Sequence, residues 1–107
     1  EAMEKDKLYL DPELNLNKVA AHTSVAAKLI SSFLNQHHGM SFNDFVNGYR
    51  VREVCDRLTD PSLQYLTISG IAFESGFNSQ ATFQRAFKSY TGVSPRNFLA
   101  RQYKKTA

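Results

Sequence analysis

Apolar residues recur three and four positions apart over most of the chain, which is the spacing of one face of an α-helix. Two stretches show this spacing clearly, and their expected core positions are Ile30, Phe33, Leu34 and His37 in the first and Phe83, Ala86, Phe87 and Tyr90 in the second. No stretch alternates apolar and polar residues as a half-buried strand does. The pattern therefore predicts an all-α fold.

The chain also contains an internal repeat. A shift of 52 residues places Leu14-Asn15-Leu16 on Leu66-Thr67-Ile68, and beyond the next turn a shift of 53 places Gly39 on Gly92. Agreement of turn residues and core positions over such a length is typical of a duplicated helical unit. We interpret the chain as two copies of one pair of helices.

Each copy is predicted to begin with a short helix and a tight turn. Asn15 and Thr67 suit the N-cap position, where a side-chain oxygen accepts a hydrogen bond from a free backbone N–H group. The helices that follow run up to tight turns at Ser24 and Gly76. A helix, a short turn and a second helix with a polar outer face make a helix-turn-helix.

The second helices of the two copies are expected at about residues 24–36 and 79–90. Gly39 and Gly92 are expected to end them, because glycine adopts the left-handed backbone conformation of a helix C-terminus without steric cost. In a helix-turn-helix this second helix enters the major groove of DNA, with its first turn leading.

Between the copies lies a long helical pattern at residues 42–58, about 25 Å long at 1.5 Å per residue. Asp60-Pro61 ends it, and a further short helix is expected within Met3–Leu10. We divide the chain into a first helix-turn-helix subdomain at 1–41, a linker helix at 42–58 and a second helix-turn-helix subdomain at 59–107.

The second copy carries the side chains best suited to reading bases. A rotation of 100° per residue puts Arg85 opposite the Phe83/Phe87 face. Glutamine pairs with adenine and arginine with guanine, while small apolar groups meet the thymine methyl. We expect base contacts from the polar and small residues of this helix, namely Gln80, Ala81, Thr82, Gln84 and Arg85.

The first copy is a weaker candidate reader. Its outward positions include Lys28, Ser31 and Ser32, with a single cation among them. Ser32 occupies the place that Arg85 holds in the second copy. Base contacts from these three residues are our expectation, and a solvated surface that supports its partner unit is the alternative.

Charge is unevenly distributed along the chain. Residues 1–65 carry a net charge of −2 and residues 66–107 carry +5, within an overall +3. A basic half favours a polyanionic partner. Contacts with DNA phosphates are expected from Ser79, Lys88, Arg50 and Arg96, although an ion pair with Glu53 or Asp56 is an alternative role for Arg50.

The chain resembles the DNA-binding domain of AraC/XylS-family transcription regulators. The resemblance rests on the pattern I-A-x-x-x-G-F-x-x-x-x-x-F-x-R-x-F-K-x-x-x-G-x-S-P-x-x-F, which runs without a break from Ile71 to Phe98. The family implies about seven helices, with two recognition helices entering successive major grooves of double-stranded DNA. By position it points to Gln80, Ala81, Thr82 and Arg85 in the second copy and to Lys28, Ser31 and Ser32 in the first.

The same resemblance implies a bacterial protein with further parts. Family members carry a sensor or dimerisation domain, and contact with RNA polymerase stays open. The chain starts at Glu1 rather than Met, so we expect it to be a piece of a longer protein. It has no apolar run near the ~20 residues of a membrane span and no signal-peptide pattern. We expect a cytoplasmic setting with no membrane contact by this segment.

Other classes of function are less well supported. The single Cys55 forms no internal disulfide, and three histidines lack partners at metal-ligand spacing, so neither a metal nor a cofactor is expected. No nucleophile–base arrangement indicates an enzyme. Two alternative functions are a helical protein-interaction module that docks a transcription partner and a DNA-modifying fragment that would use Cys55.

Overall fold

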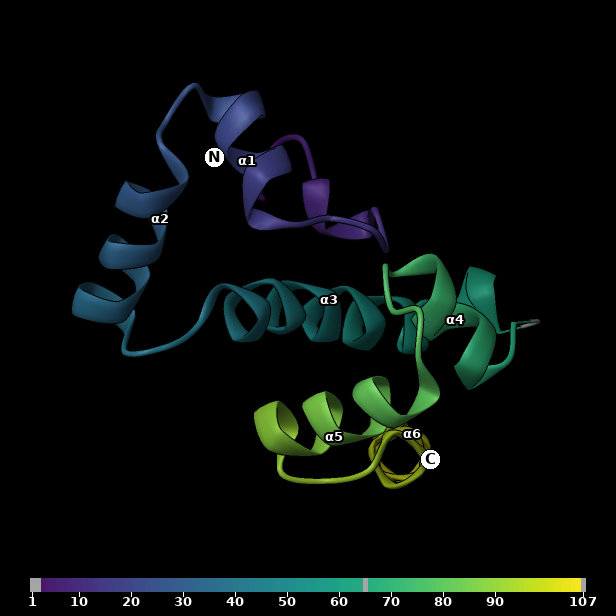
Figure 1. The fold of residues 1–107 in the computed structure, drawn as a ribbon. Helices are drawn as coiled ribbons and strands as arrows, with labels where there is room; N and C mark the ends of the chain where they lie inside the picture. Colours follow the sequence, from purple (N-terminus) through teal and green to yellow (C-terminus); the bar gives the residue numbers. More distant parts are fainter. Residues whose placement is uncertain (1–2, 65, 107) are drawn as a thin grey trace.

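The computed structural model describes residues 3–64 and 66–106, and side-chain surroundings for residues 3–64 and 66–101. Within these residues the chain forms α-helices, short 3-10 turns and one π-helical turn, and it contains no strand (Figure 1). The all-α fold that the apolar spacing predicts is confirmed. The elements, in chain order, are η1 (Leu8–Leu10), α1 (Leu16–Thr23), α2 (Ala27–Phe33), η2 (Leu34–His38), α3 (Phe42–Leu58), η3 (Pro61–Leu63), α4 (Ile68–Glu74), α5 (Gln80–Thr91) and α6 (Pro95–Thr106).

The repeat takes the form of two helix pairs. We call α1 with α2 and η2 the first unit, and α4 with α5 the second unit. Figure 1 shows α3 crossing the middle of the molecule, with α1 and α2 on one side and α5 and α6 on the other. The described residues form an elongated body of 48 × 24 × 23 Å. The helix at residues 42–58 lies where the sequence predicts it.

The predicted helix starts are confirmed. The side chain of Asn15 accepts a hydrogen bond from the backbone N–H of Lys18, and that of Thr67 accepts one from Gly70. Ser79 does the same for α5, with an oxygen–nitrogen distance of 3.3 Å to the Thr82 N–H. Each of these bonds satisfies a donor that the first turn of a helix leaves free.

The helix ends also follow the sequence pattern. Gly39 and Gly92, as predicted, take left-handed conformations with φ of 61° and 83°. Ser24 takes the same conformation with φ of 60°, although serine has a Cβ that disfavours it. The turn between α1 and α2 is thus as tight as the sequence indicates.

Two predicted helices differ from the structure. The Met3–Leu10 helix is wrong, because only Leu8–Leu10 form a single 3-10 turn after Lys7, which is left-handed with φ of 51°. The helix expected at 24–36 starts later, at Ala27, because Ser24 is left-handed and Ala26 is extended. Its last turn widens into the π-helical η2 and reaches His38.

Two apolar cores lie along α3. The second unit encloses one of them, in which Phe83 and Phe87 have no exposed surface and lie against Phe77 and α3. The other core lies under the first unit and the N-terminal segment, around Tyr9, Val19 and Val46. The α3 helix contributes residues to both cores. The division into subdomains at residues 41/42 and 58/59 stays a prediction.

Several expected core positions are wrong. Phe33 is 53% exposed, His37 is exposed, and Tyr90 is 46% exposed. Ile30 is half-buried, whereas Leu34 is buried as predicted. Period alone predicts which positions share a face, but it does not say how closely a helix approaches its neighbour.

Candidate nucleic-acid interface

The α5 helix presents a polar ridge because its apolar face is fixed in the core. Phe83 and Phe87 pack between Phe77 and Phe98, with ring centroids 5.3 to 5.8 Å apart. This packing turns the opposite side of the helix outward. The residues on that side are all exposed, and we call them the α5 crest: Ala81, Gln84, Arg85 and Lys88. At 3.6 residues per turn they span about 100° of the helix surface.

A groove lies on each side of the α5 crest. One, of ≈ 530 Å³, separates α5 from the first half of α3, and Arg85, Thr82 and Asn47 line it. The other, of ≈ 370 Å³, lies toward α4 and α6 and is lined by Gln84, Arg96 and Ser69 among others. The crest therefore stands above the flanking surface on both sides, which is the shape of an element that inserts into a groove of DNA.

Arg85 is the crest residue with the greatest capacity to bind an anion or a base. It is exposed and takes part in none of the ion pairs found among the described residues. By contrast, Arg57 is paired with Glu53 at 2.8 Å and with Glu74 at 3.6 Å. The Arg85 guanidinium keeps its planar set of donors available for a guanine edge.

The residues that flank the crest are less available for contact with DNA than the sequence alone indicates, because they are hydrogen-bonded or partly buried. Gln80 is exposed, but its side-chain amide donates a hydrogen bond to the hydroxyl of Ser69 on α4. Thr82 is half-buried on the wall of the groove beside α3. Ser79 is exposed, and its oxygen is already the N-cap acceptor, so its hydroxyl hydrogen is the group left to meet a phosphate.

Two of the residues expected to contact phosphates, Arg96 and Arg50, have clearly different surroundings. Arg96 is exposed in the first turn of α6 and shares a groove with Gln84. Arg50 is half-buried on α3 and lines the groove beside α5 together with Arg85. Its Nε donates to the Tyr9 carbonyl at 2.8 Å and its Nη2 donates to the Asp11 carbonyl at 2.9 Å. Among the described residues Arg50 forms no ion pair with Glu53 or Asp56, and Glu53 pairs with Lys7 and Arg57.

The corresponding ridge of the first unit is polar but poor in charge. Its members occupy the positions that match the α5 crest under the 53-residue shift, and we call them the α2 crest: Lys28, Ser31, Ser32 and Asn35. Lys28, Ser32 and Asn35 are exposed, whereas Ser31 is half-buried. No side chain caps this helix, since Ala26 stands at its N-cap.

Sequence reasoning missed the polar residues of α3 beside Arg85. Asn43 and Asn47 lie one helical turn apart and line the same groove as Arg85. Asn47 also accepts a hydrogen bond from Arg50 at 3.2 Å. Their spacing of four residues on the polar side of α3 was the available signal, but nothing in the sequence alone placed that side against α5.

The Cys55 thiol of α3 lies outside the two crests. Burial, followed by the nearby Asp56 carboxylate, raises the pKa of the half-buried Cys55 thiol to about 11, so the thiol stays protonated at neutral pH. Among the described residues, no three histidine, cysteine or acidic side chains gather as metal ligands. No described helix has both the length and the apolar character needed to cross a bilayer.

Comparison with known proteins gives the class of this fold. Residues 19–101 match the family model described as "Helix-turn-helix domain", and the chain belongs to this family, the AraC/XylS-type helix-turn-helix domains. The family comprises DNA-binding domains of transcription regulators and is not an enzyme family. The predicted family and class of function are thereby confirmed.

Particular relatives agree with this assignment. The transcriptional activator AarP of Providencia stuartii is 28% identical over 86 residues, which are 80% of this chain and 62% of that protein. An uncharacterised HTH-type transcriptional regulator of Staphylococcus aureus strain COL is 27% identical over 92 residues, 86% of this chain. The chain spans only 12% of the length of that staphylococcal relative.

Solved structures share the same arrangement of helices. The C-terminal domain of AraT, a response regulator from Geobacillus stearothermophilus, is 29% identical with a TM-score of 0.73, covering 89% of this chain and 76% of that one. A DNA-binding transcriptional dual regulator from Escherichia coli K-12 has a TM-score of 0.75 at 17% identity, covering 92% and 85%. The second likeness concerns the fold alone.

Proposed function

We propose that this chain reads specific sequences in double-stranded DNA with two recognition helices, α5 as the main reader and α2 as the weaker one. The observation that carries the proposal is the exposed α5 crest, on which Arg85 has no ion-pair partner among the described residues. In this proposal Arg85 and Gln84 contact base edges in one major groove, while Ala81 meets a thymine methyl.

The flanking residues have supporting roles in this proposal. Lys88 on α5 and Arg96 on α6 are exposed cations and would neutralise phosphates beside the groove. The Ser79 hydroxyl, at the N-terminus of α5, would donate to another phosphate. Gln80 would read a base after its amide leaves Ser69, and Thr82 would do so from the wall of the groove beside α3. On α2, Lys28, Ser31 and Ser32 would contact the next major groove.

The setting of the whole protein is part of the same proposal. A response regulator is among the proteins with a similar C-terminal domain, which favours a sensor or dimerisation domain elsewhere in the parent chain. Contact with RNA polymerase and a place in the cytoplasm are the corresponding expectations for a transcription regulator. Each of them requires the whole protein to be tested.

The test compares one residue on each crest. Duplexes selected from a random pool by the 107-residue chain are titrated with wild type, Arg85→Ala and Ser32→Ala, and fluorescence anisotropy gives each dissociation constant. Arg85→Ala should reduce discrimination against substituted duplexes by about 1–3 kcal/mol, which is roughly 5-fold to 160-fold. Ser32→Ala should change it by less than about 0.5 kcal/mol.

The salt dependence of binding supplies the control. Affinity should fall as salt rises, with a log–log slope of about −0.9 for each phosphate that the protein neutralises. The fold of each variant is checked by circular dichroism and urea unfolding. Binding that ignores both salt and sequence would remove the proposal, and equal losses from Arg85→Ala and Ser32→Ala would remove the ranking of the two helices.

A further inference from the structure

The N-terminal segment before α1 is bound to the second unit rather than to the first unit alone. Residues 9–12 present three backbone carbonyls to donors that come from other parts of the chain. The Arg50 guanidinium donates to the Tyr9 and Asp11 carbonyls, and the Asn78 amide lies 3.4 Å from the Pro12 carbonyl. Arg50 belongs to α3 and Asn78 to the turn between α4 and α5.

Gly76 shows how closely this segment and that turn approach each other. A Cβ at Gly76 would lie 2.1 Å from the Tyr9 carbonyl oxygen and 2.8 Å from Arg50 Nε. Both distances are far below van der Waals contact, and the φ of 107° at Gly76 is one that glycine adopts most readily. The glycine therefore allows three chain segments to meet at one point.

Arg50 occupies the centre of this contact. Besides its bonds to the two carbonyls, it donates to Asn47 on its own helix, and its guanidinium carbon lies 6.0 Å from the centre of the Phe77 ring. Phe77 follows Gly76 directly and is 2% exposed. Ser79, the N-cap of α5, comes two residues after Phe77, so the contact lies directly before the recognition helix.

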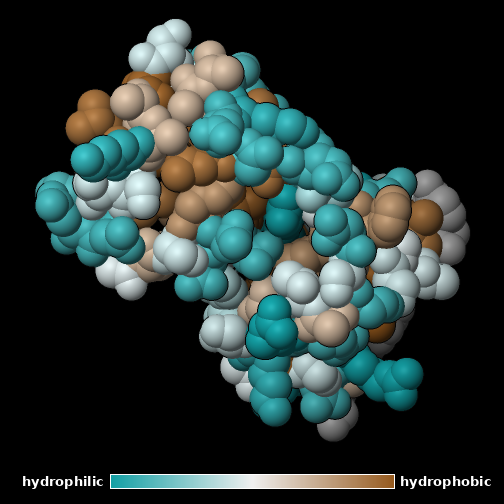
Figure 2. Space-filling view, in the orientation of Figure 1, coloured by the Kyte–Doolittle hydropathy of each residue, from teal (hydrophilic) through white to brown (hydrophobic). Residues whose placement is uncertain are grey.

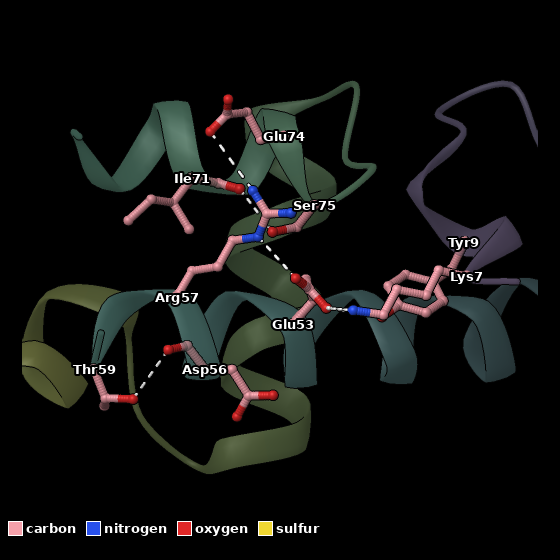
Figure 3. Close-up of polar contacts among 9 residues, drawn as sticks. All are labelled: Lys7, Tyr9, Glu53, Asp56, Arg57, Thr59, Ile71, Glu74 and Ser75. Carbon is pink, nitrogen blue, oxygen red and sulfur yellow. Dashed lines mark hydrogen bonds and ion pairs between the residues drawn. The ribbon is translucent and has the colours of Figure 1, made fainter. Parts of the chain in front are cut away.

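A network of ion pairs holds the other side of the same segment. Figure 3 shows Lys7 and Tyr9 beside Glu53 of α3, and Arg57 reaching from Glu53 toward Glu74 of α4. The Tyr9 hydroxyl donates to Glu53 at 2.8 Å. Burial and this bond to a carboxylate raise the pKa of Tyr9 to about 12. The segment is thus fixed to α3 at both its backbone and its side chains.

From these contacts we infer that Arg50 is a positioning residue for DNA reading: it fixes the α4–α5 turn against the segment that leads into α1, and so sets the orientation of one recognition helix relative to the other. This inference rests on the proposed function, because it assumes that both helices engage DNA. It replaces the phosphate contact that the sequence suggests for Arg50, since the guanidinium is half-buried and bonded to carbonyls.

The positioning role of Arg50 matters because two linked recognition helices gain affinity only when their relative geometry matches the spacing of their half-sites. One inserted base pair turns the second half-site by about 34° and moves it by about 3.4 Å. A rigidly oriented pair of helices tolerates this poorly, whereas a loosened pair adjusts to it. Arg50 is therefore expected to affect the gain from binding both half-sites together, and to leave contact with a single half-site unchanged.

The decisive variant is Arg50→Lys, which keeps the positive charge but has one nitrogen and cannot bridge two carbonyls as the guanidinium does. Three duplexes are compared by anisotropy: a selected duplex, the same duplex with the half under α2 scrambled, and the same duplex with one base pair inserted between the halves. The wild type should prefer the first by at least about tenfold. In Arg50→Lys the preference for the selected duplex over the scrambled one, and over the one with the inserted base pair, should each fall to about threefold or less. Its affinity for the scrambled duplex should be unchanged.

A second pair of variants guards against a simple loss of folding. Gly76→Ala drives a methyl group into Tyr9 and Arg50, whereas Gly92→Ala adds a methyl at a similar positive φ of 83° with no atom within 4 Å. Urea unfolding measures the stability of each. Gly76→Ala should lose the spacing preference as Arg50→Lys does, whereas Gly92→Ala should keep it.

Each contrary result has a distinct meaning. Unchanged preferences in Arg50→Lys, or an equal loss on all three duplexes, would overturn the positioning role. A salt slope that becomes shallower by about 0.9 in Arg50→Gln would show a phosphate contact instead. A wild-type chain with no preference for the selected duplex would overturn the proposed function itself, and the positioning role with it.

Discussion

Phe83 of α5 has no exposed surface, whereas Phe33 of α2 is 53% exposed and Leu29 beside it is 64% exposed. The two helices occupy equivalent places in the repeat, yet only α5 has fully buried aromatic residues on its inner face. Figure 2 shows the consequence, because hydrophobic surface gathers at the upper left over the first unit. An apolar cavity of ≈ 490 Å³ opens there between α1, α2 and α3.

The difference has a source in the sequence. In the second unit the rings of Phe77, Phe83 and Phe87 form a continuous packed row, which Phe98 of α6 extends. The first unit has aliphatic Ile30 and Leu34 at the positions of Phe83 and Phe87, and smaller side chains bury less apolar area. Phe33 contacts His37 and His38 on its own helix instead. The same repeat thus gives one closed unit and one open unit.

The largest expected effect comes from breaking the closed unit. Phe83→Ala should destabilise the chain by about 3–5 kcal/mol, because it removes a fully buried ring and leaves a cavity. Phe33→Ala is the same chemical change on the exposed helix and should cost about 1 kcal/mol or less. Urea unfolding followed by circular dichroism measures both. Equal costs would show that α2 closes over its cavity in solution and that the comparison between the units fails.

Much of this architecture follows from the sequence by simple rules. Asn15, Thr67 and Ser79 cap helices where a free N–H needs an acceptor, and Gly39 and Gly92 end them. These are local effects, so local sequence predicts them. The row of outward residues on α5 follows in the same way from helical rotation and the burial of Phe83.

The parts that sequence could not predict depend on contacts between distant segments. The sequence alone predicts that Arg50 is a surface cation on a linker helix, because it does not show that the backbone of residues 9–12 lies against it. The amide of Gln80 is likewise bonded to Ser69, on another helix. Exposure of Phe33 depends on how far α2 stands from α3, which the period of apolar residues does not determine.

A smaller effect is expected from making the two crests alike. Ser32→Arg places a guanidinium at the position that Arg85 occupies in the repeat, on an exposed part of α2. If α2 enters a major groove, sequences selected by this variant should gain a guanine preference at one position of the first half-site, worth about 1–3 kcal/mol. If the new arginine contacts a phosphate and not a base, the log–log salt slope should steepen by about 0.9.

The control for this gain is a cation placed away from the crest. Asn17→Arg adds the same charge on the exposed surface of α1. It should raise affinity for all duplexes slightly, through long-range attraction, and should select no base. A guanine preference that appears with Asn17→Arg, or fails to appear with Ser32→Arg, would show that the α2 crest does not lie in a groove.

The smallest expected effect concerns the start of α2. Ala26 is its N-cap, with extended φ and ψ of −60° and 138° and no side-chain acceptor, whereas Ser79 caps α5. Ala26→Ser supplies that acceptor and should stabilise the chain by about 0.5–1 kcal/mol in urea unfolding. Ala27→Ser is the matched control, because one residue further on a serine lies inside the helix and should be neutral or cost about 0.5 kcal/mol.

Amide hydrogen exchange locates this gain within the first unit. The N–H groups of Leu29 and Ile30 already bond to the Ala26 carbonyl at 3.0 and 3.2 Å, so a firmer N-cap should slow their exchange. Amides of α5 should be unaffected, because their helix is capped and seated separately. Slower exchange throughout both units would mean that they unfold as one body, and the contrast between an open and a closed unit would then describe packing without a difference in local stability.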